Sequence, residues 1–127
     1  MSEYMFDPVE LTVQWYLREV QDVQVTITRP EKLPERFVQV QAVGGNAALV
    51  SQRAMVTFIC WGKSRADAMR FAETIRAHVR GCRELAGLPV YRVREIGGPT
   101  SRPDPETGRQ RYQFTLELSV RGKQFAP

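Results

Sequence analysis

The last third of the chain shows the clearest alternation of apolar and polar positions. Between 112 and 120 every second residue is apolar and the residues between them are polar; the apolar ones are Tyr112, Phe114, Leu116, Leu118 and Val120. A period of two is typical of a strand with one buried face. The pattern predicts antiparallel strands over about 89–96 and 110–121, joined by a long loop rich in Pro, Gly and Arg.

A helical period marks the beginning of the chain. The apolar positions that follow it are Val9, Val13, Tyr16, Leu17 and Val20. Pro8 suits the first helical position, where a missing N–H costs nothing. Asp7 is the expected N-cap, with Glu10 three residues on to complete a capping box. The pattern predicts a helix over about 7–20.

A second helix is predicted over about 65–80. Ser64 is its expected N-cap, and Asp67 stands in the capping-box position. One face of this helix is apolar and consists of Ala68, Phe71, Ala72, Ile75 and Val79.

Three further strands are predicted between the helices, over about 23–28, 37–43 and 54–61. The turn residues Gly44, Gly45 and Asn46 favour a chain reversal after the second of these strands. The strand over 54–61 is apolar on both faces, which indicates a central strand covered on two sides.

The predicted element order is therefore α-β-β-β-α-β-β. A run of mainly antiparallel strands with two helices on one side is an α+β two-layer sandwich. The 127 residues are expected to form a single domain, 1–127, because a chain of this length builds one core.

The composition indicates in which compartment the protein is found, but it does not indicate a function. The chain is 43% hydrophobic and 25% charged, and no apolar run is long enough for a membrane span. No secretory signal is visible at the start, so we expect a cytosol-like compartment. The formal net charge is +4 and the arginines are scattered. Either they form an ordinary solvated surface, or oligomerisation gathers some of them into a positive rim.

Residues for catalysis or metal binding are scarce. The chain has one histidine, His78, and two cysteines, Cys60 and Cys82, which are far apart in sequence and expected to be reduced thiols. Asp104 and Glu106 lack the other ligands of a calcium loop. We therefore expect no enzyme activity, no metal and no cofactor.

Trp61 has two open interpretations. It ends the 54–61 strand and either packs beneath the loops or anchors a partner, since interfaces favour Trp, Tyr and Arg. Tyr112 and Phe114 fall on the apolar face of their strand, where core packing is expected rather than base stacking.

Over nearly its whole length the sequence resembles the tail terminator proteins of long-tailed bacteriophages. The residues that carry this are the opening helix 7–17 with Val9 and Trp15, the segments 33–40 and 43–45, the strand-to-helix passage 61–68, residues 93–95, Gly98-Pro99, the segment 103–108, Arg111-Tyr112 and the closing 120–122.

The resemblance implies a virion structural protein without catalysis. Such a protein forms a homo-oligomeric ring of six copies that caps the tail tube, ends tube polymerisation and joins the tail to the head connector. DNA passes through the lumen without sequence-specific binding, and no membrane is involved. The ring is assembled in the host cytoplasm and resides in the virion.

Five residues are candidates for subunit or tube contacts: Arg53, Trp61, Arg102, Arg109 and Arg111. The turn-rich segments 44–53 and 98–110 are expected to be mobile or ordered by partners. Two alternatives remain open: another phage neck or minor tail completion protein, and a small nucleic-acid-binding α+β domain.

Overall fold

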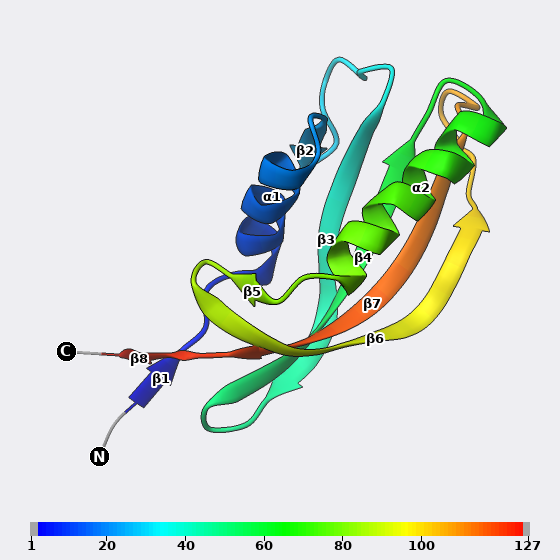
Figure 1. The fold of residues 1–127 in the computed structure, drawn as a ribbon. Coiled ribbons are helices and arrows are strands. Elements are labelled where there is room, and N and C mark those ends of the chain that lie inside the picture. The colour runs from blue at the N-terminus through cyan, green and yellow to red at the C-terminus, as the bar shows by residue number, and fades with distance from the viewer. Residues whose placement is uncertain (1–2, 126–127) are drawn as a thin grey trace.

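Two helices lie on one face of a strongly curled six-stranded sheet in the computed structural model, which describes residues 3–125 (Figure 1). The elements are β1 (Glu3–Met5), α1 (Val9–Val20), β2 (Gln24–Thr26), β3 (Phe37–Ala47), β4 (Ser51–Trp61), α2 (Arg65–Arg80), β5 (Glu84–Leu85), β6 (Leu88–Ser101), β7 (Arg111–Arg121) and β8 (Lys123–Phe125). The predicted α+β class, with a mainly antiparallel sheet and two helices on one side, is confirmed.

The strand order of the sheet is β2-β3-β4-β7-β6-β5, and β2–β3 is its parallel pair. The predicted order α-β-β-β-α-β-β forms the centre of this arrangement. Three short strands were not predicted: β5, and the pair β1 and β8, which forms a separate two-stranded sheet near both ends of the described chain. Strands this short have no alternating pattern to read, because they exist only through their pairing.

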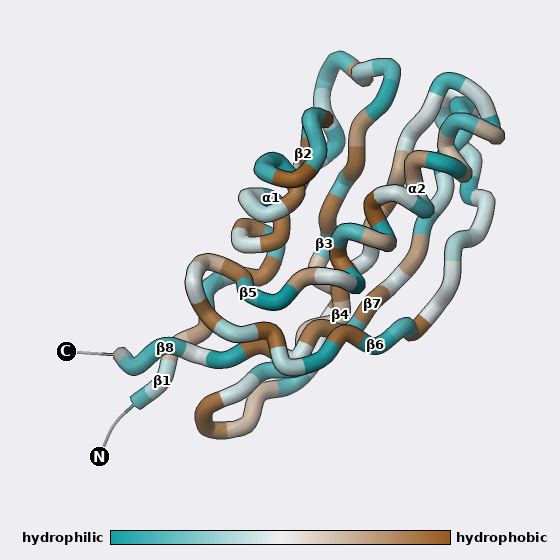
Figure 2. Tube along the Cα trace, in the orientation of Figure 1, coloured by the Kyte–Doolittle hydropathy of each residue, from teal (hydrophilic) through white to brown (hydrophobic). Residues whose placement is uncertain are grey.

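The core lies between the helices and the sheet, where the hydrophobic segments of the chain gather (Figure 2). The predicted alternation of β7 is confirmed, since Phe114, Leu116 and Leu118 are almost fully buried. Phe114 stacks on Phe58 of β4, with ring centroids 5.0 Å apart. Aromatic pairs of this kind stabilise a core beyond the area they bury.

Helix α2 begins and ends where the sequence predicts. The Ser64 Oγ accepts a hydrogen bond from the Asp67 backbone N–H at 3.1 Å, so the N-cap is confirmed. The Asp67 carboxylate accepts from the Lys63 N–H at 2.9 Å, one residue before the bond that a capping box would make, and also pairs with Arg36. These contacts lower the pKa of Asp67, first through Arg36 and then through the Lys63 N–H.

The predicted cap of α1 is wrong. The helix begins at Val9, and no side chain caps it. Asp7 instead forms an ion pair with Lys123 at 2.8 Å, and Glu10 accepts a hydrogen bond from the Ala42 N–H of β3 at 2.9 Å. Both carboxylates bind groups that are far away in the sequence, so the local sequence pattern could not predict these contacts.

The predicted turn at Gly44–Asn46 is also wrong. The chain continues through a bulge in β3, and the hairpin reverses only between Ala47 and Ser51. Gly45 has a φ of +135°, and a Cβ there would lie 2.0 Å from the Arg53 carbonyl oxygen. Glycine is therefore needed for the bulge rather than for the reversal, and 44–53 is mostly hairpin instead of an irregular loop.

Residues 98–101, predicted as loop, belong to β6, so the irregular connection to β7 is limited to 102–110.

Candidate functional site

The Trp61 side chain is fully buried on the sheet face that points away from the helices. Its ring stacks on Phe37 with centroids 4.9 Å apart, and its Nε1 donates to Gln39 Oε1 at 2.9 Å. Of the two interpretations offered by the sequence, packing beneath the loops is therefore the observed one. Trp61 is inaccessible as a direct partner contact in this subunit.

Three arginines surround this tryptophan. The guanidinium carbons of Arg29, Arg109 and Arg111 lie 5.2, 5.4 and 5.2 Å from the Trp61 ring centroid. A cation at this distance from an aromatic face is attracted by the ring quadrupole. The far side of β4 is thus covered, as predicted, but at this end by arginine side chains from two loops and from the first residue of β7 rather than by a second layer.

Arg109 and Arg111 are both engaged inside the subunit. The Arg109 guanidinium donates to the carbonyl oxygens of Pro34 at 2.7 Å, Glu35 at 2.6 Å and Gly62 at 3.4 Å. Arg111 Nε donates to the Arg102 carbonyl oxygen at 2.6 Å. Their first role in this structure is to fasten the 102–110 connection to neighbouring loops.

Asp104 is the buried anion that balances these cations. Its carboxylate accepts two hydrogen bonds from Arg29, at 2.9 and 3.1 Å, and two from Thr107, from the hydroxyl at 2.6 Å and the N–H at 3.1 Å. Arg111 lies 3.9 Å away. The hydrogen bonds from Arg29, followed by those from Thr107, hold the pKa of Asp104 well below its usual range.

The remaining two candidates, Arg53 and Arg102, are exposed. Arg102 belongs to the loop end of the sheet, beside Arg111. Arg53 lies eight positions before Trp61 on β4, or about 26 Å away at the usual strand rise. The structure therefore brings Trp61, Arg102, Arg109 and Arg111 together and leaves Arg53 at the opposite end.

Arg53 belongs to a group of arginines that the sequence did not reveal. On β7, Ser119 pairs with Arg53 of β4 on one side and with Arg92 of β6 on the other. Arg94 and Arg121 stand two positions away along β6 and β7. We call this surface the arginine face, and its members are Arg53, Arg92, Arg94 and Arg121.

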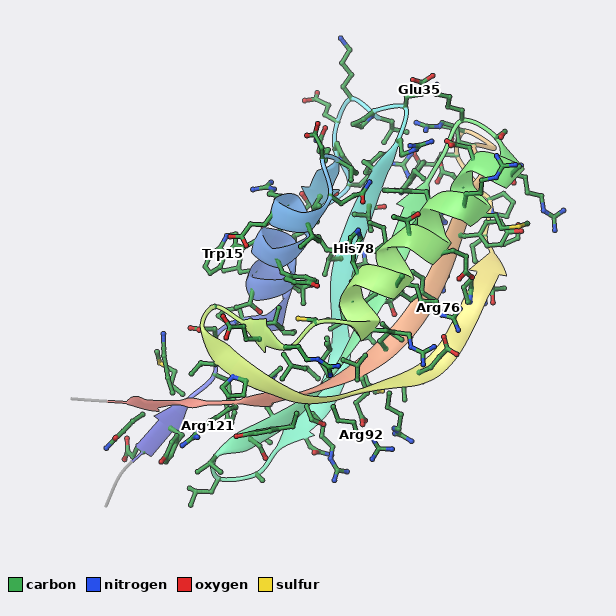
Figure 3. The ribbon with its side chains drawn as sticks, in the orientation of Figure 1. Trp15, Glu35, Arg76, His78, Arg92 and Arg121 are labelled. Carbon is green, nitrogen blue, oxygen red and sulfur yellow. The ribbon has the colours of Figure 1, made fainter. Side chains whose placement is uncertain are left out.

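The arginine face lies on the side of the sheet opposite the helices. In Figure 3 the Arg92 side chain projects below β6, whereas Arg76 and His78 of α2 lie above it. A hollow of about 410 Å³ opens here, lined by Arg53, Tyr91, Arg92, Arg94, Glu117 and Ser119. The strand register was needed to find this group, because its members come from three strands.

One carboxylate offsets part of this charge. Arg94 pairs with Glu117 at 3.3 Å, and within residues 3–125 no ion pair is formed by Arg53, Arg92 or Arg121. Three guanidinium groups thus remain uncompensated on one open surface.

The histidine and the two cysteines, which the sequence analysis considered for catalysis or metal binding, lie in surroundings that are typical of structural residues. His78 is partly buried, and its Nε2 lies 3.0 Å from Gln21 Oε1. Both cysteines are buried free thiols, and burial raises the pKa of each. In the part of the chain that the structure describes, no group of three His, Cys, Asp or Glu side chains could hold a metal ion.

A second surface hollow, of about 520 Å³, lies between α1 and the turn around β5. Trp15, half exposed, forms one wall and points outward from α1 (Figure 3). The helices within residues 3–125 are too short or too polar to cross a membrane.

No protein-family model matches the chain, and no curated protein matches it either.

Proposed function

We propose that this chain is a virion structural protein of a long-tailed phage, which forms a ring on the tail tube, ends tube polymerisation and joins the tail to the head connector. The observation that carries the proposal is a pair of long, incompletely paired sheet edges on opposite sides of the same sheet.

One free edge belongs to β3. The short β2 pairs only with 37–39, so the remainder of β3, up to Ala47, has a strand on one side only. The Ala42 N–H donates a hydrogen bond to the Glu10 carboxylate, so residues 43–47 are the part of this strand edge that remains open.

The other free edge belongs to β6. The short β5 reaches only Leu88 and Pro89, so the rest of β6, through Ser101, pairs with β7 alone. Register shifts interrupt this edge between Val90 and Thr100, and such irregularities limit uncontrolled strand pairing.

Two different free edges suit a closed ring. A head-to-tail interface joins one surface of a subunit to a different surface of the next, and repetition closes the ring when the rotation fits. Addition of an edge strand from a neighbour supplies main-chain hydrogen bonds to both partners. In a six-membered ring, the free part of β3 in one subunit would pair with the free part of β6 in the next.

The two faces of the sheet fit the same arrangement. The helices cover one face and give it an outer layer, whereas the other face is polar over β7, which presents Gln113, Thr115, Glu117 and Ser119 there. In the proposed ring this polar face lines the lumen through which DNA passes. Such a role needs no catalysis, cofactor or membrane, and it is performed in the virion after assembly in the host cytoplasm.

The test has two parts. Native mass spectrometry of the purified protein, alone and with ends of preformed tail tubes, should give a species of six times the 14.5 kDa chain. Tube subunits polymerised in its presence should then stop at a limited length. A protein that stays monomeric under both conditions would contradict the ring, and a ring that leaves tube length unchanged would favour another neck or tail completion protein.

A further inference from the structure

We infer that the arginine face is a contact surface for the phosphate backbone of duplex DNA, read without regard to sequence. The inference rests on the proposed function only in assuming that DNA meets this surface in the lumen of the ring. DNA binding itself can be measured whether the protein is a monomer or a ring.

The arrangement of the arginines comes from the strand register. Arg53 and Arg92 flank Ser119 on the two neighbouring strands, so their Cα atoms are about 10 Å apart. Arg121 follows Ser119 by two positions on the same face, about 7 Å along β7. Three arginines that form no ion pair within residues 3–125 thus stand on adjacent strands, where the sheet rather than a loop fixes their backbone positions.

The chemistry of this surface suits a polyanion. Guanidinium groups bind phosphate oxygens through paired N–H donors. Arg94 is offset by Glu117, and Ser119 adds a neutral hydroxyl between the charges. A surface with three free cations and one internal ion pair attracts a highly charged rod and gives it several points of contact.

An acidic protein is the less suitable occupant. Protein interfaces are enriched in aromatic residues and arginine, but their core is depleted of charge overall, whereas four of the six residues that line this hollow are charged. Interfaces with DNA are more polar and much more positive. The chemistry of the hollow therefore favours DNA over a protein partner.

Contacts of this type do not select a sequence. Phosphate contacts position a protein on DNA but carry no base information, and they permit sliding. A surface that holds DNA weakly and lets it move agrees with a lumen through which a genome passes.

The experiment measures binding of a fluorescent 30-base-pair duplex by anisotropy between 50 and 200 mM KCl, with two unrelated sequences. The variant is Arg53→Gln with Arg92→Gln and Arg121→Gln. The matched control is Arg70→Gln with Arg80→Gln and Arg83→Gln, which removes the same charge from exposed positions on α2 and the turn after it.

Wild-type protein should bind both duplexes equally. The arginine-face variant should bind more weakly, and the slope of log K against log salt should fall by about 3 for each subunit on the DNA, since each phosphate contact contributes about 0.9. The control should keep the wild-type slope, and thermal unfolding should show that both variants fold.

Three results would overturn the inference. An equal loss of DNA affinity in the variant and the control would show that the effect comes from net charge alone. An unchanged slope in the variant would place the DNA elsewhere. Poly-glutamate that binds the wild-type protein at least as tightly as the duplex would identify an acidic protein as the partner. Native mass spectrometry of the same samples reports the ring separately, so failure of the ring and failure of DNA binding are distinguished.

Discussion

The Asp104 carboxylate and the Arg29 guanidinium form two parallel hydrogen bonds, 2.9 and 3.1 Å long, between segments 75 residues apart in sequence. This pair fastens the 102–110 connection to the chain between β2 and β3. Together with Arg109 and Arg111 it holds the loops over Trp61.

The Asp104 pair predicts a specific pH dependence. Because the folded-state pKa of Asp104 is lowered, the pair stabilises the protein above the unfolded pKa of about 3.9, and this contribution is lost as pH falls below that value. Asp104→Asn should therefore unfold more easily than wild type at pH 7, and the difference should shrink from pH 4 downwards. Urea unfolding at pH 7, 4 and 2 measures it.

The neighbouring Glu106 supplies the control for this experiment. Its carboxylate is exposed and lies 3.3 Å from Arg29. Glu106→Gln should change stability little at any pH, because an exposed ion pair contributes little. An Asp104→Asn variant whose deficit persists unchanged at pH 2 would show that the carboxylate charge is not the cause.

The predicted N-cap of α2 was confirmed and that of α1 was wrong. Substitutions at these two positions should therefore lower the free energy of unfolding by different amounts and for different reasons. Ser64→Ala removes the hydroxyl that accepts the Asp67 N–H, and should lower the free energy of unfolding by about 1 kcal/mol. Asp7→Ala removes a partly exposed ion pair with Lys123, which is worth roughly 0–1 kcal/mol and is screened by salt. Chemical unfolding in 0.05 and 1 M NaCl separates them: only the Asp7→Ala cost should diminish. Equal salt dependence would mean that Asp7 caps α1 after all.

The elements with a long apolar period were readable from the sequence. Helix α2 and strand β7 carry their pattern over many residues, and most of their core residues are those predicted. The features that were misread depend on partners that are distant in the chain. The sequence predicted Asp7 as a helix cap, but in the structure Asp7 pairs with Lys123. It predicted Gly45 as a turn residue, but Gly45 lies against the Arg53 carbonyl within the β3–β4 pairing.

The candidate contact residues followed the same rule. Residue type and a position in or next to the long loop pointed to Arg109 and Arg111, but their hydrogen bonds to carbonyls and their contact with Trp61 are tertiary. Arg92 and Arg121 were visible as single basic residues, and only the register joined them to Arg53. Composition thus identified cationic side chains, and pairing determined which of them are free.

Trp61 and Trp15 predict a contrast in stability. Trp61→Phe keeps most of the ring but leaves the buried Gln39 Oε1 without its donor, which should cost about 1–3 kcal/mol. Trp15 is half exposed, so Trp15→Phe should stay within about 0.5 kcal/mol of wild type. Urea unfolding followed by far-ultraviolet circular dichroism measures both. A neutral Trp61→Phe would mean that the hydrogen bond to Gln39 is replaced by water.

The β3–β4 hairpin gives the last prediction, which concerns assembly. Leu49 at its tip is 75% exposed, more than any other large hydrophobic side chain within residues 3–124, and Val50 beside it is 39% exposed. Leu49 and Val50 together form a small apolar patch at the end of a long hairpin, and we predict that this patch contacts a neighbouring subunit in the proposed ring. Leu49→Asp should therefore leave the free energy of unfolding of the subunit within about 0.5 kcal/mol of wild type.

The same substitution should weaken the proposed ring, because a carboxylate would be buried without a partner in the subunit interface. Native mass spectrometry at matched concentrations compares wild type, Leu49→Asp and Met69→Asp, the last being a control at an exposed apolar position on α2. The expected result is loss of the six-copy species in Leu49→Asp alone. If both variants keep the wild-type mass, the hairpin tip does not lie in the subunit interface. If both lose it, the ring depends on apolar surface in general and the hairpin has no special place in it.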